Sequence, residues 1–189
     1  MKLNRPLILG SSSPRRQFLM KEAGFEFTLA KPADDESFPN HLPAEVVASY
    51  LAEKKAQSLA GMIKSDELVI TSDTVVILDH HILNKPADRE DAFRMISMLA
   101  GRTHQVITAV CIMAKEKQVV FDDRTLVTFA SLTPDEIYYY IDRCKPFDKA
   151  GSYGAQDWLG IVGIEKIHGS YFTVMGMPMH KVYEELKRF

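Results

Sequence analysis

The sequence has few features of an extracellular, membrane or nucleic-acid-binding protein. It contains only two cysteines among 189 residues, and Cys111 and Cys144 are too far apart to form a disulfide framework or a metal-ligand spacing. No apolar run approaches the roughly 20 residues that span a membrane, and the opening MKLNRPLIL has too short an apolar part for a signal peptide. A net charge of −2 provides no basic excess to neutralise nucleic-acid phosphates. We therefore expect a cytoplasmic protein that binds neither a membrane nor nucleic acid.

Several common catalytic signatures are also missing. The chain has no GxxxxGK[ST] loop, no GxGxxG after a strand, no HExxH and no GxSxG. These absences disfavour a P-loop ATPase and a Rossmann oxidoreductase. A composition of 46% hydrophobic and 25% charged residues is ordinary for a globular protein. Together with the length and the lack of repeats or linkers, it predicts one domain over residues 1–189, or two closely joined lobes.

Helix and strand signals alternate along the chain. A buried strand at 7–9 precedes a helix that Ser13 caps and Pro14 begins, with Phe18 and Leu19 as its apolar positions. Further helices are expected over 43–60, 88–101 and 133–144 and from Pro178; strands are expected near 25–30, over 67–83 with a polar interruption at 72–74 and a hairpin near 79–81, and over 104–114, 118–132 and 159–167. This order predicts an α/β fold with a mixed central sheet and flanking helices.

The first candidate site is the turn SSSPRR at residues 11–16. Arg15 and Arg16 fall in the first turn of the expected helix, where the helix dipole disfavours cations. A bound anion would compensate, since serine hydroxyls, exposed N–H groups and guanidinium groups all donate to phosphate oxygens. Two interpretations remain: a phosphate site that includes Ser11, or arginines that point into water.

Acidic residues provide a second candidate. Asp73 interrupts the apolar stretch LVITSDTVVIL, and a carboxylate at the end of a buried strand is costly unless a cation, a metal or hydrogen bonds meet it. The alternative is a structural acid that is capped by backbone N–H groups or paired with a lysine. Asp34, Asp35 and Glu36 supply further oxygens of the kind that Mg²⁺ prefers, although such acidic loops are commonly just solvated.

Three more polar side chains stand out. Lys55 lies on the apolar side of its expected helix, and Lys85 follows a hairpin; either can simply extend into solvent. Gln156 comes after a loop of small residues and offers an acceptor and two donors, which suits the edge of a neutral base. His80 and His81 are expected to be exposed in a turn, whereas the tyrosines at 138–140 and the methionines of VMGMPMH are expected to pack.

Seven segments together resemble one family. In order they are SSSPRR, DDE, AEKKA, SDTVV, NKP, DKAGSYGAQ and GSYFTVMGMP. They are similar to the Maf family of nucleoside triphosphate pyrophosphatases from about residue 7 to the last helix. The resemblance implies an α/β fold related to the inosine triphosphate pyrophosphatases, with two lobes around a cleft. It also implies hydrolysis of a nucleoside triphosphate to the monophosphate and pyrophosphate with Mg²⁺ or Mn²⁺, and a possible homodimer.

The resemblance assigns roles to individual residues. Asp73 corresponds to the acid that activates water, with a metal-ligand role as the alternative, and Glu36 corresponds to a metal or water ligand. Ser11, Arg15, Arg16, Lys55 and Lys85 correspond to the residues that bind the phosphates. The chemistry is consistent, because metal coordination and a placed carboxylate make hydroxide accessible, and cations offset the charge on leaving pyrophosphate.

The loop before Gln156 bears on the choice of base. It resembles the family branch that acts on dTTP and UTP, whereas the branch that acts on 7-methyl-GTP carries glutamate at this position. An amide suits the neutral uracil edge, and a carboxylate suits a cationic methylguanine. Thr74 and Arg15 resemble the other specificity positions. The chain departs from the family at Gly10, at MGMP and at AQDWLG, where the family loop is richer in glycine and where Trp158 can wall the base pocket or pack below it.

Two alternative functions remain open. One is the same reaction on modified-base nucleotides such as 7-methyl-GTP. The other is a nucleotide-binding regulator of cell division without significant turnover, which the presence of Asp73, Glu36, Lys55 and Lys85 disfavours, because binding alone does not require a residue that activates water.

Overall fold

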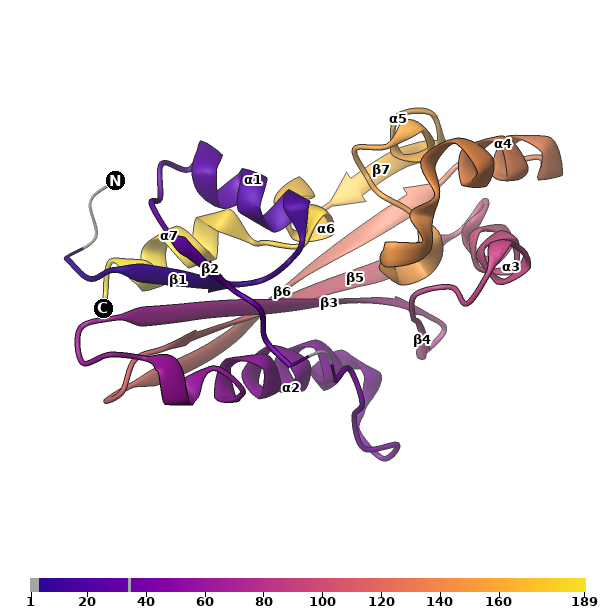
Figure 1. The fold of residues 1–189 in the computed structure, drawn as a ribbon. Coiled ribbons are helices and arrows are strands. Elements are labelled where there is room, and N and C mark those ends of the chain that lie inside the picture. The colour runs from indigo at the N-terminus through magenta and orange to yellow at the C-terminus, as the bar shows by residue number, and fades with distance from the viewer. Residues whose placement is uncertain (1–3, 34) are drawn as a thin grey trace. The chain divides into compact units, whose positions relative to one another are not determined.

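A computed structural model describes residues 4–33 and 35–189 (Figure 1). The chain divides into two compact units. The first unit comprises the chain up to Asp73, residues 108–123 and residues 176–189, and the second comprises residues 74–107 and 124–175. Three of the four boundaries between them fall inside strands β3, β5 and β6, and the fourth follows residue 175, so both units are built from several separate stretches of sequence.

The strands and helices follow the alternation that the sequence predicts. The strands are β1 (Leu7–Gly10), β2 (Thr28–Ala30), β3 (Leu68–Leu78), β4 (His81–Leu83), β5 (Thr103–Met113), β6 (Gln118–Phe129) and β7 (Ile164–His168). The α-helices are α1 (Pro14–Glu22), α2 (Ala44–Gln57), α3 (Arg89–Leu99), α4 (Pro134–Cys144), α5 (Trp158–Gly163), α6 (Tyr171–Met175) and α7 (Met179–Leu186). Short 3₁₀ turns occupy Ala60–Met62, Pro146–Asp148 and Ala150–Ser152.

The strand pairing confirms the mixed sheet. The order is β2-β1-β3-β5-β6-β7, and β4 also pairs with β3. β1 pairs in parallel with β2 and β3, whereas the pairs β3–β4 and β6–β7 are antiparallel. Because the sheet contains both kinds of pair and carries helices beside it, the predicted α/β class with a mixed sheet is confirmed.

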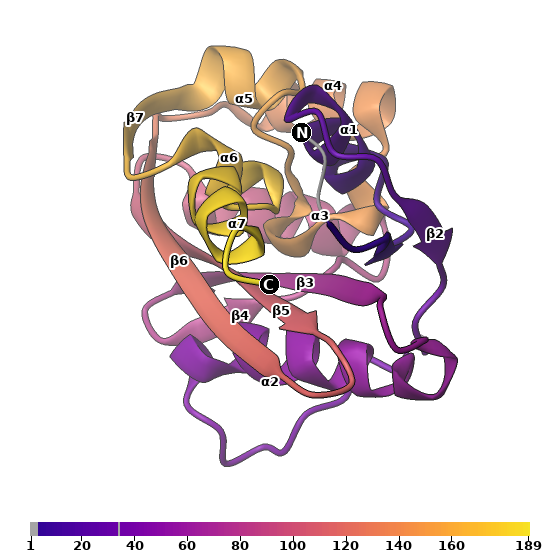
Figure 2. The same cartoon turned by 90° about the vertical axis from the view of Figure 1, so that its left-hand side faces the viewer.

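In the first unit, β1 lies between β2 and the start of β3. Helices α1 and α7 lie on one side of these strands and α2 lies on the other, as two views agree (Figures 1 and 2). The buried face of α2 consists of small and branched residues, which allow close packing: Val47, Ala48, Leu51, Ala52 and Ala56. Gly10 is needed in β1, since a Cβ there would lie 2.7 Å from the side chains of both Leu59 and Thr71.

In the second unit, α3 and α4 pack over a core that includes Ile96, Phe129 and Tyr140. Two of its local signals act as the sequence predicts. Thr133 and Glu136 form a reciprocal capping box at the start of α4. The β3–β4 hairpin turns at Asp79 and His80, whose φ angles of 48° and 67° are those of a two-residue type I′ turn.

Five local expectations are wrong. The polar residues 72–74 do not interrupt β3, so Asp73 lies inside a continuous strand rather than at its end. Residues 158–163 form helix α5, and only the remainder of the expected strand 159–167 is β-structure. Phe18 is 53% exposed although the helix pattern predicted burial. Pro43 is the N-cap of α2 rather than its first residue, and α2 ends before the expected limit.

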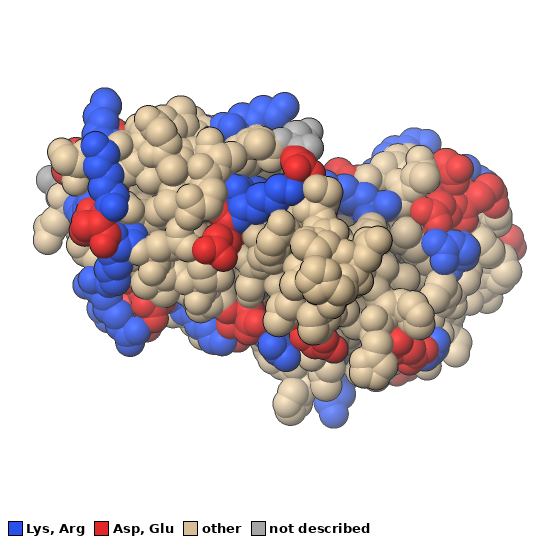
Figure 3. Space-filling view, turned by 90° about the horizontal axis from the view of Figure 1, so that it is seen from below, with Lys and Arg blue, Asp and Glu red and all other residues tan. Residues whose placement is uncertain are grey.

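The surface carries both charge signs. On the face drawn in Figure 3, lysine and arginine side chains are interspersed with aspartate and glutamate. Within residues 4–33 and 35–189, no helix combines the length and the apolar character needed to cross a membrane.

Candidate active site

The centre of the candidate site in the first unit is an ammonium group between two carboxylates. Lys55 on α2 donates from Nζ to Asp73 Oδ1 in β3, and the same nitrogen lies 3.4 Å from Glu36 Oε1. The Lys55 and Asp73 side chains are only 11% and 9% exposed, whereas Glu36 is 40% exposed. This pairing offsets the desolvation of both buried charges. Three of the predicted residues, from three distant parts of the sequence, are therefore in contact.

Arg16 belongs to the same charged group. Burial lowers the pKa of its guanidinium below the usual value, while the nearby carboxylates of Asp73 and Glu36 raise it and Arg15 lowers it. Its Nε donates to the carbonyl oxygen of Gly176 at 2.9 Å. Arg16 is thus held by the backbone, and its charge lies within electrostatic range of both acids.

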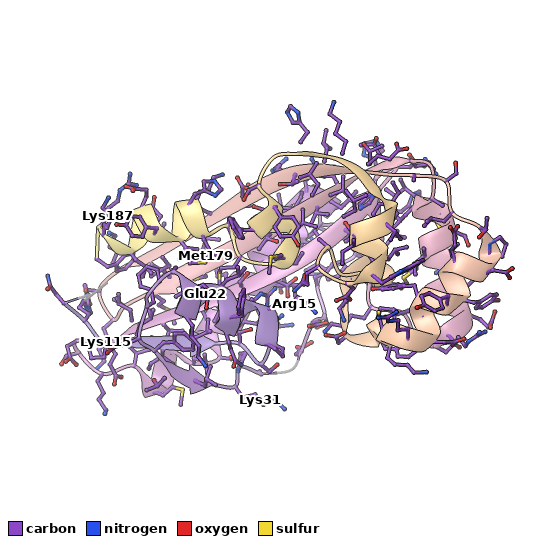
Figure 4. All side chains as sticks on the ribbon, turned by 90° about the horizontal axis from the view of Figure 1, so that it is seen from above. Arg15, Glu22, Lys31, Lys115, Met179 and Lys187 are labelled. Atoms are coloured by element: carbon purple, nitrogen blue, oxygen red, sulfur yellow. The ribbon has the colours of Figure 1, made fainter. Side chains whose placement is uncertain are left out.

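The turn before α1 and the start of that helix carry three of the residues that the sequence predicts to bind phosphate. Helix α1 begins at Pro14, and the Ser13 N-cap has no side-chain hydrogen bond. The Ser13 N–H instead donates to Ser11 Oγ at 3.2 Å, and Ser11 is buried. Arg15 lies at the start of α1 and Glu22 at its end (Figure 4). The sequence places an arginine where the helix dipole repels cations and attracts anions.

The two acids fit a divalent cation that takes its remaining ligands from substrate phosphates and water. Glu36 Oε1 and Asp73 Oδ1 both contact one nitrogen, so two carboxylates converge on one cation position. Among the described residues, no group of three histidine, cysteine or acidic side chains is arranged to hold a metal. Mg²⁺ is commonly bound by one or two carboxylates together with phosphates and water, which matches this donor set. Asp34 of the DDE segment lies outside the described residues.

The other predicted residues lie in the second unit. Thr74 is half-buried in β3, and Lys85 is exposed just after β4. Gln156 is half-buried in the loop before α5. The loops that carry Lys85 and Gln156 are linked by their backbones, because the Gly151 N–H donates to the Asn84 carbonyl at 3.1 Å.

Gln156 has a distinctive amide. Its Oε1 is buried, and no donor among the residues that the structure describes is hydrogen-bonded to it. A buried acceptor without a donor is costly and uncommon in folded proteins. This property fits a side chain whose partner is a ligand.

Sequence reasoning missed two supports of the site. The Gly176 carbonyl accepts from both Arg16 and, at 3.1 Å, Ser72 Oγ. Tyr140, which the sequence assigned to packing alone, is buried but also hydrogen-bonds the loop of Gln156 through its hydroxyl. The segment GSYFTVMGMP, which contains Gly176, was already one of the family-like motifs. The run of three tyrosines contained no indication that the Tyr140 hydroxyl would bind a loop.

Several secondary expectations are confirmed. His80 and His81 are exposed, and Met175 and Met177 are buried. Both cysteines are free thiols. Trp158 packs edge-on against Tyr139 at a centroid distance of 4.9 Å and lies against the core of the second unit.

Comparisons with known proteins agree over almost the whole chain. A dTTP/UTP pyrophosphatase of Porphyromonas gingivalis is 48% identical over 186 residues, which cover 97% of this chain and 94% of that protein. Proteins with the same name from Parabacteroides distasonis and Bacteroides fragilis are 44% and 47% identical, and each match covers at least 96% of this chain and 95% of the relative.

A more remote likeness and a family model complete the comparison. A nucleoside-triphosphatase / dITP/XTP pyrophosphatase structure from Mycobacterium abscessus aligns with a TM-score of 0.39 and 13% identity over 67% of this chain and 74% of that one. The family model described as Maf-like protein matches residues 6–189. With this match and relatives of 44–48% identity, the chain belongs to the Maf-like protein family.

Proposed function

We propose that the protein hydrolyses dTTP and UTP to the nucleoside monophosphate and pyrophosphate. The observation that carries this proposal is the buried pair of Asp73 and Lys55 with the more exposed Glu36 beside it, which combines a carboxylate able to take a proton with a cation able to bind phosphate. The names of the close relatives support the same substrates. The whole matched chain is proposed to act as one functional domain.

The phosphates are proposed to bind to the cations of the first unit. Lys85 is a further proposed phosphate-binding residue, as the family resemblance implies. Arg15 and Arg16 provide guanidinium groups, and Ser11 provides a hydroxyl that accepts one hydrogen bond and retains a proton to donate. Lys55 provides a compact charge at the carboxylates. As the bond to the leaving group breaks, negative charge grows on pyrophosphate, and fixed cations stabilise that charge more than they stabilise the bound substrate.

Asp73 is proposed to take a proton from the attacking water. The water oxygen forms a bond to the α-phosphorus, the bond to the oxygen bridging the α- and β-phosphates breaks, and pyrophosphate leaves. Lys55 fixes the orientation of the Asp73 carboxylate. Glu36, which is more exposed, is proposed to orient the water or to share a cation with Asp73.

The reaction is proposed to need a divalent cation. When bound at Glu36 and Asp73, Mg²⁺ or Mn²⁺ would lower the pKa of water and neutralise phosphate charge. A role of Asp73 mainly as its ligand is the alternative to proton transfer. Calorimetric titration of the nucleotide-free protein with Mn²⁺, in wild type and Glu36→Gln, measures this binding without turnover.

Gln156 is proposed to read the base. Uracil and thymine carry an N3–H donor, and the buried Gln156 Oε1 is an acceptor that lacks one within the described structure. Thr74 and Arg15 are proposed to contribute to the same choice of substrate. A homodimer, which the family resemblance implies, and a cytoplasmic location, which the sequence predicts, are further proposals.

Pyrophosphate release tests the function directly. We would measure it for dTTP, UTP, CTP, ATP, GTP and 7-methyl-GTP with and without Mg²⁺ or Mn²⁺. Metal-dependent release that favours dTTP and UTP is expected. Preference for 7-methyl-GTP would assign the modified-base reaction instead, and nucleotide binding without release would identify a regulator.

A further inference from the structure

The loop before α5 is held in one backbone conformation. Gly151 and Ser152 both have left-handed φ angles, 67° and 62°. A Cβ on Gly154 would lie 2.5 Å from Asp157 Oδ2, and one on Gly160 would lie 2.0 Å from the Ala155 carbonyl oxygen. Such close approaches leave the backbone little freedom to shift. The segment that carries Gln156 is therefore built tightly, although residues 153–157 between the 3₁₀ turn Ala150–Ser152 and α5 form neither helix nor strand.

A single hydroxyl joins the two ends of this segment. Tyr140 Oη accepts the Gly154 N–H at 3.1 Å and donates to Asp157 Oδ2 at 3.1 Å. The Asp157 N–H also donates to the Gly154 carbonyl at 3.1 Å, which closes the turn around Gln156. A phenol has one proton and two lone pairs, so it can make both bonds at once.

The surroundings keep Tyr140 in the form that this arrangement needs. The residue is fully buried in the core of the second unit, and burial, followed by the charge of Asp157, raises the pKa of its phenol. The phenol therefore stays protonated and donates. Lys149 Nζ lies 3.7 Å from Asp157 Oδ2 and 2.8 Å from Asp148 Oδ1, so the acceptor of the phenol proton also faces a cation.

We propose that Tyr140 is a positioning residue for base recognition, whose hydroxyl fixes the 154–157 turn so that Gln156 Oε1 is pre-oriented toward an N–H donor of the base. This inference rests on the proposed function. Tyr140 touches no substrate in this role. It lowers the cost of binding by holding the amide in its bound conformation beforehand.

The test compares Tyr140→Phe with Tyr138→Phe. Both residues lie on α4, but the Tyr138 hydroxyl donates to Glu90 at the surface, at 3.0 Å, so Tyr138→Phe controls for loss of a hydroxyl from the same helix. The substrates are UTP and N3-methyl-UTP, which lacks the N–H that Gln156 would accept. For wild type and Tyr138→Phe we expect UTP to be preferred by about tenfold or more in kcat/KM.

For Tyr140→Phe, we expect this preference to fall several-fold, mainly through a higher KM for UTP with kcat little changed. A purely structural role would reduce turnover of both substrates in parallel. An unchanged ratio of UTP to N3-methyl-UTP, or an equal loss for both, would overturn the proposal. If Tyr140→Phe does not fold, Asp157→Ala removes the acceptor instead, and the same change in ratio is expected.

Amide hydrogen exchange provides a measurement that does not depend on turnover. The Gly154 and Asp157 amides are expected to exchange faster in Tyr140→Phe than in Tyr138→Phe, and equal rates would contradict the role of the hydroxyl. If the wild type released no pyrophosphate, the proposed function would be wrong. Amide exchange would still test whether the Tyr140 hydroxyl holds the 154–157 turn.

Discussion

Lys55 donates to the carboxylate of Asp73 and, from the same nitrogen, faces Glu36 at 3.4 Å. Lys54, the preceding residue on α2, pairs instead with the exposed Asp35 at 2.7 Å. Adjacent lysines thus point to different acids. The three residues of one charged group come from a loop, a helix and a strand, and the packing of α2 on β3 brings them together.

Asp73→Asn is expected to remove most turnover while nucleotide binding remains nearly intact. The amide keeps the shape but cannot take a proton from water, so we expect kcat to fall about 10²- to 10⁴-fold, with a much smaller change in the Kd for a non-hydrolysable dTTP analogue. Asp79→Asn, which changes an exposed acid in the β3–β4 turn, is the control. Near-normal kcat in Asp73→Asn would show that the proton-accepting role is wrong.

Lys55→Gln is expected to weaken both phosphate binding and the Asp73 environment. Removing one partner of a buried pair leaves the other charge unpaired, so thermal stability should fall together with kcat/KM. Lys54→Gln is the matched control, because Lys54 has the same side chain one position earlier but is bound to Asp35 and Ser37 at the surface. Inhibition by pyrophosphate reports phosphate binding. If Lys55→Gln and Lys54→Gln changed this inhibition equally, a phosphate-binding role for Lys55 would be contradicted.

Gln156→Glu is expected to change the ranking of substrates. A carboxylate can still accept from the uracil N3–H, but it cannot donate to the neighbouring carbonyl oxygens and repels them, whereas it attracts a cationic base. Steady-state kcat/KM for dTTP and UTP should fall relative to 7-methyl-GTP, while Gln57→Glu on α2 should leave the ranking as in wild type. The same ranking in Gln156→Glu would remove this residue from base recognition.

His104 is expected to make stability depend on pH. Burial lowers the pKa of its imidazole from 6.5 to about 4. Between pH 4 and pH 6.5 the unfolded chain therefore binds more protons than the folded chain. The free energy of unfolding should rise as pH increases across this window, and this stabilisation should disappear as pH falls from 6.5 toward 4. The full difference is about 3 kcal/mol at most.

Urea unfolding at pH 7 and pH 4.5 checks this prediction. His104→Gln should show a smaller difference between the two pH values than wild type, because the group that gains a proton on unfolding is gone. His81→Gln, which changes an exposed histidine of β4, should retain the wild-type difference. If His104→Gln lost as much stability between pH 7 and pH 4.5 as the wild type, the acid sensitivity would belong to other groups.

The start of helices and the tight turns could be predicted from sequence because short segments determine them. Thr133 and Glu136 lie three residues apart and cap each other, and Pro14 begins α1. The membership of Asp73, Lys55 and Glu36 in one site followed from family resemblance rather than from spacing. Local rules failed for residues 158–163. Their β-branched residues predicted a strand, but the segment forms a helix in which Gly160 packs against the Ala155 carbonyl.

The sequence by itself determined the α/β class, the order of the elements and the candidate residues, since hydrophobic periodicity, caps and turn residues act over a few positions. The tertiary structure decided that Asp73 lies inside β3, that Arg16 donates to Gly176, and that Tyr140 holds the turn of Gln156. These contacts join residues that are far apart in the chain or separated by a loop. Their partners are selected by packing and by the need to satisfy buried polar groups, which no local pattern encodes.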